Sequence, residues 1–173
     1  MDRNELERII REKLQEIMGA EKDDTFMVEA SGRHVHLTKE HVEALFGEGY
    51  ELTPVKDLSQ PGQFAAKERV RVIGPKGEFS NVAILGPCRN FSQVELSLTD
   101  CREIGVKGVI RESGKIEGTP GILLGVGDKY VHLDKGVIVA KRHIHMTRED
   151  AERFSVKDGE TVKVKIRSDR PLI

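Results

Sequence analysis

The chain has 173 residues with 28 basic and 29 acidic side chains and a formal net charge of −1, so it lacks the overall positive field that attracts nucleic acid or a membrane surface. No apolar run approaches the roughly 20 residues of a transmembrane helix, and no signal peptide is visible. Cys88 and Cys101 are the only cysteines; they do not make a disulfide framework, which favours a reducing cytoplasm.

The first 22 residues are predicted to form an amphipathic helix. Its apolar side chains recur at helical spacing and are Leu6, Ile10, Leu14 and Ile17. Charged residues occupy much of the remaining surface, and Gly19 is a natural stop. Two interpretations stay open: the helix packs on its own domain, or it is a docking peptide whose apolar face binds a groove on a partner.

After residue 25 the pattern changes to short alternating segments separated by glycine, proline and aspartate. Strands are predicted over residues 69–73, 136–140 and 161–166, with a turn over 74–77 after the first of them. Many short strands at close spacing are typical of barrels or sandwiches, with few and short helices.

An internal repeat is the most informative feature of the sequence. Residues 33–40 recur as residues 142–149 at a constant offset of 109. Both copies lead into a predicted short helix, and Thr38 and Thr147 stand where a helix N-cap belongs. Duplication of a structural unit explains this spacing, so two related barrels are predicted.

Each copy of the repeat contains a His-x-His pair, formed by His34 and His36 in the first copy and by His143 and His145 in the second. On a strand, residues i and i+2 share one face with Cα atoms about 6.6 Å apart, so both imidazoles can bind one ion. A solvent-facing pair is the alternative for one copy alone, but two copies in the same context favour metal binding. A further ligand must come from elsewhere in the chain.

The candidate for that ligand is Glu95, on the polar face of a strand predicted over residues 93–98. Arg89 follows a Gly-Pro turn, where a guanidinium suits bidentate capture of phosphate. A solvated charge is the alternative interpretation for both residues. His41 and His132 are interpreted as ordinary structural or surface histidines.

Four stretches of the chain resemble the PduL-type phosphate propanoyltransferases, and the similarity extends from about residue 27 to the C-terminus. These stretches are residues 31–38, 57–65, 86–95 and 136–147.

The resemblance implies a mainly β protein with two related β-barrels and short capping α-helices, in addition to the N-terminal amphipathic helix. Residues 33–140 would form the barrel with the first His-x-His pair, and residues 25–32 with 141–173 would form the second. Residues 1–22 resemble the encapsulation peptides that dock such enzymes onto shell or core proteins of bacterial microcompartments in the cytoplasm. A homodimer is expected.

The resemblance also implies two divalent metal ions, usually zinc, near the junction of the barrels. The residues that the resemblance assigns to the site are His34, His36 and Glu95 for the first metal, His143 and His145 for the second metal, and Arg89 for phosphate. The family continues with a His-x-Asp-x-Asp-Glu-type motif whose histidine completes the second metal shell, whereas this sequence ends at Ile173. Either the chain is truncated, or water or another subunit supplies that ligand.

The implied reaction converts a short acyl-CoA, propanoyl-CoA or acetyl-CoA, and phosphate into acyl phosphate and coenzyme A, by direct attack of metal-bound phosphate on the thioester. Three alternatives stay open: an acyl-enzyme at Cys88, where Arg89 could favour a thiolate; a dinuclear metal-dependent thioester hydrolase; and a non-catalytic metal-binding module. Lys107, Arg111 and Lys115 could contact coenzyme A, or could equally be solvated charges.

Overall fold

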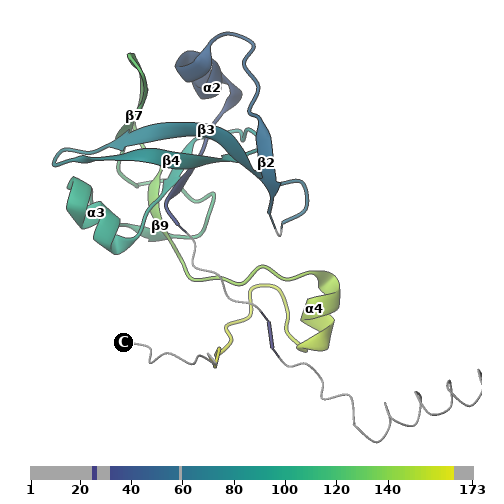
Figure 1. Ribbon diagram of the computed structural model, residues 1–173. Coiled ribbons are helices and arrows are strands. Elements are labelled where there is room, and N and C mark those ends of the chain that lie inside the picture. Colours follow the sequence, from purple (N-terminus) through teal and green to yellow (C-terminus); the bar gives the residue numbers. More distant parts are fainter. Residues whose placement is uncertain (1–24, 27–31, 59, 166–173) are drawn as a thin grey trace, which may run out of the picture. The chain divides into compact units, whose positions relative to one another are not determined.

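The computed structural model describes residues 25–26, 32–58 and 60–165 (Figure 1). The chain divides into two compact units. One comprises residues 31–145, and the other draws its described residues, 25–26 and 146–165, from both sides of the first along the chain.

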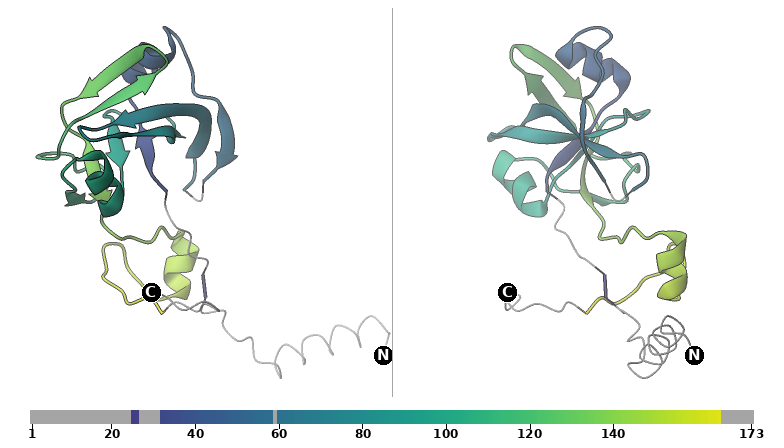
Figure 2. Two further views of the ribbon diagram at one scale, coloured as in Figure 1. Left: turned by 60° about the vertical axis from the view of Figure 1, so that its left-hand side comes forward. Right: turned by 45° about the vertical axis from the view of Figure 1, so that its right-hand side comes forward.

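Over its described residues, the unit of residues 31–145 is built on one sheet of nine strands. They are β1 (His34–His36), β2 (Pro54–Asp57), β3 (Phe64–Ile73), β4 (Glu78–Gly86), β5 (Gln93–Glu95), β6 (Ile110–Arg111), β7 (Ile122–Val126), β8 (Lys129–Leu133) and β9 (Val137–Ala140). The strand order is β6-β9-β5-β1-β4-β3-β7-β8, and β2 pairs with β3. The sheet curls into a half-barrel (Figure 2). It does not close into a full barrel, since its outer strands β6 and β8 do not pair with each other among the described residues. The prediction of a mainly β fold is confirmed.

Alternating burial explains the longest strand. In β3, Ala66, Val70 and Val72 are buried while Lys67 and Arg69 are exposed, as expected for a strand with one face on the core. The turn after β3 closes with a hydrogen bond from the Gly74 N–H to the Gly77 carbonyl, 2.9 Å long. The predicted strand over 69–73 and its turn are therefore confirmed, as is the strand predicted over 136–140, which forms β9.

The helices of the described residues are few and short, as predicted: α2 (Lys39–Phe46), α3 (Leu98–Ile104) and α4 (Arg148–Arg153). Thr38 and Thr147 cap α2 and α4, each accepting a backbone N–H bond on its side chain. Figure 1 shows α2 above and α3 below the pair β3–β4. None of these helices has the length and apolar character that crossing a bilayer requires.

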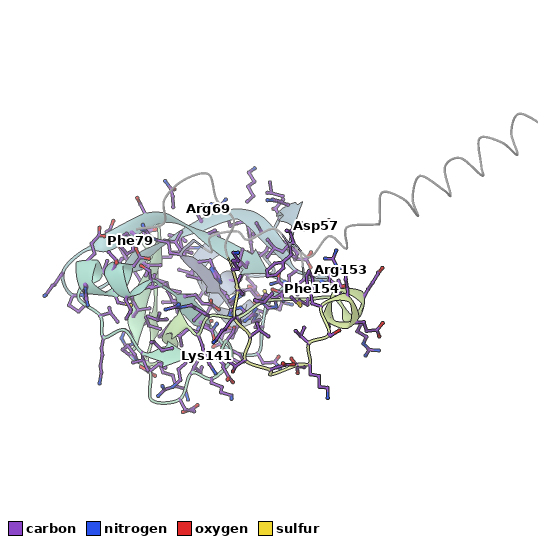
Figure 3. The ribbon with its side chains drawn as sticks, turned by 90° about the horizontal axis from the view of Figure 1, so that it is seen from below. Asp57, Arg69, Phe79, Lys141, Arg153 and Phe154 are labelled. Carbon is purple, nitrogen blue, oxygen red and sulfur yellow. The ribbon has the colours of Figure 1, made fainter. Side chains whose placement is uncertain are left out.

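Arg33 fixes the start of β1 to α3 and β4. Its guanidinium pairs with Asp100 at 2.8 Å and lies over the Phe79 ring, 3.8 Å from the ring centroid; Phe79 on β4 is labelled in Figure 3. Asp100 also completes a capping box with Ser97 at the N-terminus of α3. The strand that carries the first His-x-His pair therefore has an anchored entry.

Three sequence predictions differ from the structure. The strand predicted over 93–98 ends at Glu95, because Ser97 and Asp100 form the capping box of α3. The second His-x-His pair lies outside any strand, and residues 161–165 form no strand because they have no ladder partner among the described residues. The second barrel is therefore not confirmed: residues 146–165 contain α4 and no strand.

A contact between two aromatic rings characterises the other unit. Phe26 and Phe154 meet edge to face, with ring centroids 5.5 Å apart, and Arg153 covers the Phe154 ring at 4.5 Å. Arg153 and Phe154 lie at the end of α4 (Figure 3). The predicted helix over residues 1–22 lies outside the described residues, as do residues 27–31 of the segment 25–32 expected to join the second barrel.

Candidate metal centre

The pairing of β1 with β5 places four polar side chains on one face of the sheet. The register is antiparallel and sets His34 opposite Glu95, Val35 opposite Val94, and His36 opposite Gln93. Because side chains alternate along a strand, the histidines face the same side as Glu95, whereas Val35 points to the other side and is fully buried. The first His-x-His pair thus lies on a strand, as predicted.

The structure brings together the three residues expected to hold the first metal. Nε2 of His34 lies 3.6 Å from Oε2 of Glu95, and Nε2 of His36 lies 3.9 Å from Oε1. One potential ligand atom from each residue lies within 4.8 Å of the others. All three side chains are buried, with residue exposures of 9%, 3% and 8% for His34, His36 and Glu95.

Backbone carbonyls orient both imidazoles. Nδ1 of His34 lies 2.9 Å from the carbonyl oxygen of Gly32, and Nδ1 of His36 lies 3.2 Å from that of Leu85. A carbonyl oxygen only accepts, so Nδ1–H is the donor in each bond. In the neutral ring this leaves Nε2 with its lone pair facing Glu95, which is how protein groups usually orient a metal-binding histidine.

The pKa shifts of Glu95 and His36 also fit a metal ligand set. Burial would raise the pKa of Glu95, but the hydrogen bond and charge of His34, the charge of His36 and the Ser113 hydroxyl lower it to about 2. The pKa of His36 falls to about 4 through burial and the positive charge of Arg89. Burial lowers the pKa of His34, but Glu95 outweighs it and the net shift is upward. A carboxylate and a neutral imidazole are ligands that zinc and related cations accept.

Arg89 lies at the rim of this cluster. Its backbone N–H donates to the Leu37 carbonyl at 2.8 Å, and Nη1 donates to the Ser113 hydroxyl at 3.4 Å. The chain reaches it from Gly86, where a Cβ would lie 2.3 Å from the Phe64 ring, so the close approach requires glycine. Burial lowers the pKa of the half-buried guanidinium, while Glu95 raises it. The site therefore combines a buried carboxylate with a fixed cation.

Comparison with known proteins adds a direct observation. A family model described as phosphate propanoyltransferase matches residues 27–173. The chain is similar to proteins named phosphate propanoyltransferase from Leptotrichia buccalis and Sebaldella termitidis, with 93% and 73% identity over all 173 residues and 82% of each relative. A protein of the same name from Clostridioides difficile is 55% identical over 168 residues, 96% of this chain and 80% of the relative.

The chain belongs to the phosphate propanoyltransferase family. The resemblance to the PduL-type enzymes is confirmed.

The second His-x-His pair has a similar local arrangement but an open setting. Nε2 of His143 and Nε2 of His145 lie 3.0 Å apart, and Nδ1 of His143 donates to the Lys141 carbonyl at 2.6 Å. Burial and His143 lower the pKa of His145, while the charge of Glu95 raises it, so the carboxylate lies within electrostatic reach. Both histidines are exposed, and the described residues add no third His, Cys, Asp or Glu ligand to this pair.

Sequence reasoning missed two side chains beside Glu95. Gln93 is fully buried and donates to Oε1 of Glu95 at 2.7 Å, and the Ser113 hydroxyl lies 3.2 Å from the same oxygen. The sequence could have indicated Gln93, because residues two apart on one strand share a face and Gln93 precedes Glu95 by two. It had no such signal for Ser113, since a turn far along the chain carries it.

The remaining candidates have ordinary environments. Nδ1 of His41 lies 2.7 Å from the Ser92 hydroxyl, and exposed His132 lies 3.3 Å from Asp134. Neither belongs to the cluster of potential ligands. Cys88 is an exposed free thiol, and its pKa is raised, mainly by partial burial. Arg89 is not among the groups that shift this pKa, so the alternative of a Cys88 thiolate favoured by Arg89 gains no support.

Proposed function

We propose that this protein transfers a short acyl group between coenzyme A and phosphate, with propanoyl-CoA as the substrate named by the family and acetyl-CoA as the smaller alternative. The convergence of His34, His36 and Glu95 beside Arg89 carries the proposal, together with family membership. A pocket distinguishes acyl groups that differ by one methylene by only about 1–3 kcal/mol.

The residues present fit a bound divalent cation, such as zinc. His34 and His36 offer oriented nitrogens and Glu95 a carboxylate held ionised, so these three would hold the first ion. His143 and His145 would contribute to the second. When bound, the cations would hold phosphate oxygens, polarise the thioester carbonyl and stabilise the departing thiolate.

Arg89 supplies the anion-binding group of the protein itself. Its guanidinium can hold two phosphate oxygens in a bidentate manner. A phosphate oxygen forms a bond to the acyl carbon, the carbon–sulfur bond breaks, and the sulfur leaves with its electron pair as the coenzyme A thiolate. This step needs no covalent enzyme intermediate. Much of the catalysis then comes from orienting the phosphate toward the thioester and from neutralising the negative charge of the phosphate.

The test measures thiol release from propanoyl-CoA with and without phosphate, and with a chelator present. We expect release that requires phosphate and is abolished by the chelator and by His34→Ala. His132→Ala is the matched control, because His132 is an exposed histidine outside the cluster. Release that does not need phosphate would instead indicate the dinuclear thioester hydrolase.

Metal binding without any thiol release would instead indicate a non-catalytic metal-binding module. Arg89 beside the cluster supports the transferase, because a guanidinium can bind two oxygens of a phosphate.

The proposal extends to the parts of the chain outside the described half-barrel. The segment of residues 1–22 docks on shell or core proteins of a bacterial microcompartment, and residues 25–32 with 141–173 belong to a second barrel. The enzyme acts as a homodimer. Fusion of residues 1–22 to a fluorescent reporter tests the docking: co-localisation with the shell supports it, and a diffuse signal contradicts it.

A further inference from the structure

A closed set of hydrogen bonds surrounds one oxygen of Glu95. Gln93 Nε2 donates to Oε1 of Glu95 at 2.7 Å and to the Ser113 hydroxyl oxygen at 3.0 Å. The Ser113 hydroxyl lies 3.2 Å from the same Oε1 and 3.4 Å from Nη1 of Arg89. Gln93 and Ser113, which we call the Glu95 clamp, therefore hold Oε1 from two sides.

Only one assignment of donors and acceptors satisfies the Glu95 clamp. The backbone N–H of Gly114 lies 2.8 Å from the Gln93 side-chain oxygen and can only donate, which fixes the orientation of the amide. The amide nitrogen of Gln93 then supplies both remaining donors. Ser113 accepts from Gln93 and Arg89, so its own proton is directed to Oε1 of Glu95.

The turn that carries Ser113 is built to hold this position. The Lys115 N–H donates to the Glu112 carbonyl at 3.0 Å, and Gly114 adopts a φ of +92°, a conformation that L side chains rarely adopt. Gln93 lies opposite His36 in the ladder and has no exposed surface. Burial of an amide costs free energy unless it is hydrogen-bonded, and the three bonds of Gln93 both offset that cost and fix the orientation of the amide.

We propose that Gln93 and Ser113 are positioning residues that occupy Oε1 of Glu95 and leave Oε2 as the oxygen offered to a metal ion, with Ser113 joining this carboxylate to Arg89. The inference rests on the metal centre proposed above. Oε2 lies 3.6 Å from Nε2 of His34, and Oε1, which the clamp occupies, lies 3.9 Å from Nε2 of His36. Outer partners of this kind typically contribute 10- to 100-fold to metal affinity.

The experiment measures the affinity of the full chain for zinc by competition with a chromogenic chelator. Ser113→Ala removes the hydroxyl from an exposed residue and should weaken binding by roughly 10-fold or more without changing the melting temperature. Ser113→Thr restores the hydroxyl and should restore the affinity. Gln93→Met, which keeps the volume but removes the amide, should weaken binding at least as much.

Glu112→Gln is the matched control. It lies in the same turn and pairs with Lys115 and Lys141 at the surface, but it does not contact the Glu95 clamp. Substitution of Co²⁺ for zinc gives a second measurement, because the visible absorption of bound cobalt reports its ligand geometry. The spectrum should change in Ser113→Ala and stay unchanged in Glu112→Gln.

The outcomes separate the clamp from the metal centre. If His34→Ala abolishes zinc binding while Ser113→Ala binds with unchanged affinity and an unchanged cobalt spectrum, the clamp is refuted and the metal centre stands. If His34→Ala binds zinc as the parent chain does, the metal centre itself is refuted, and the clamp with it. Should Gln93→Met fail to fold, Ser113→Ala alone decides.

Discussion

Nε2 of His34 lies 3.6 Å from Oε2 of Glu95 because the two residues stand directly opposite each other in the antiparallel pair β1–β5. A slip of β1 by one residue in this ladder would turn His34 to the opposite face from Glu95. Val35 and Val94 oppose that slip, since they pair on the other face and are fully buried. The apolar packing of the sheet therefore fixes the geometry of the candidate site.

Glu95→Gln tests the carboxylate of the metal centre. Glutamine keeps the shape of the side chain but removes the charge, so we expect zinc affinity to fall by more than the roughly 10- to 100-fold expected for loss of an outer partner. Competition with a chelator measures the change. Glu103→Gln, an exposed substitution on α3, is the control, and equal affinity of the two variants would contradict the assignment of Glu95.

Arg89→Lys tests phosphate binding. Lysine keeps the positive charge but loses the two-pronged geometry of the guanidinium. We expect the KM for phosphate to rise by roughly 10-fold, with a smaller change in the KM for the acyl-CoA, since one charge-assisted hydrogen bond is worth about 1.5–3 kcal/mol. Arg102→Lys on the exposed face of α3 serves for comparison. A KM for phosphate that stays at the parent value would rule out this role.

Asp100→Asn should show a pH-dependent loss of stability. Burial would raise the pKa of Asp100, but hydrogen bonds with Ser97 and the charge of Arg33 hold it below its ordinary value. Because the folded-state pKa is depressed, the stabilisation is present above the unfolded pKa of about 3.9 and is lost as the pH falls through the folded pKa.

We therefore expect Asp100→Asn to lower the free energy of unfolding by about 1 kcal/mol near neutral pH. The difference should shrink as the pH falls below about 4. Urea unfolding with a chelator present measures both, so that metal binding does not contribute. The same experiment on Glu103→Gln should give no such trend, and a pH-independent difference for Asp100→Asn would contradict the argument.

Cys88→Ser should leave turnover within a fewfold of the parent chain. The raised pKa of the Cys88 thiol keeps it protonated near neutral pH, and a thiol is a far weaker nucleophile than a thiolate. Thiol release from propanoyl-CoA in the presence of phosphate measures turnover. A loss of two or more orders of magnitude would instead revive the acyl-enzyme route.

Local patterns predicted much of the described half-barrel. Thr38 and Thr147 carry their own capping signal, and the alternation in residues 69–73 requires only the period of a strand. The placement of His34 and His36 on one face of a strand could be predicted for the same reason. These features depend on neighbours a few residues away, so a single sequence contains the information for them.

The remainder depended on which strands pair. Glu95 is two residues short of the Ser97 N-cap, so apolar alternation alone extended its strand too far. Ser113 follows β6, and it lies near Glu95 because β6 pairs with β9, which in turn pairs with β5. No spacing rule in the sequence connects residues 95 and 113. Residues 161–166 have the alternation of apolar and polar side chains that is typical of a strand. A strand also needs a neighbouring strand for its backbone hydrogen bonds, and residues 161–165 have none among the described residues.

The hydrogen bonds from the two imidazoles to Gly32 and Leu85 orient the proposed metal ligands through protein groups alone. A small zinc-dependent domain, in contrast, is unfolded until its ligands close around the metal. Here Val35 and Val94, behind the site, belong to the buried apolar core, which stabilises these strands independently of an ion. Removal of the proposed ion is therefore expected to leave the half-barrel folded, and rebinding would need no refolding.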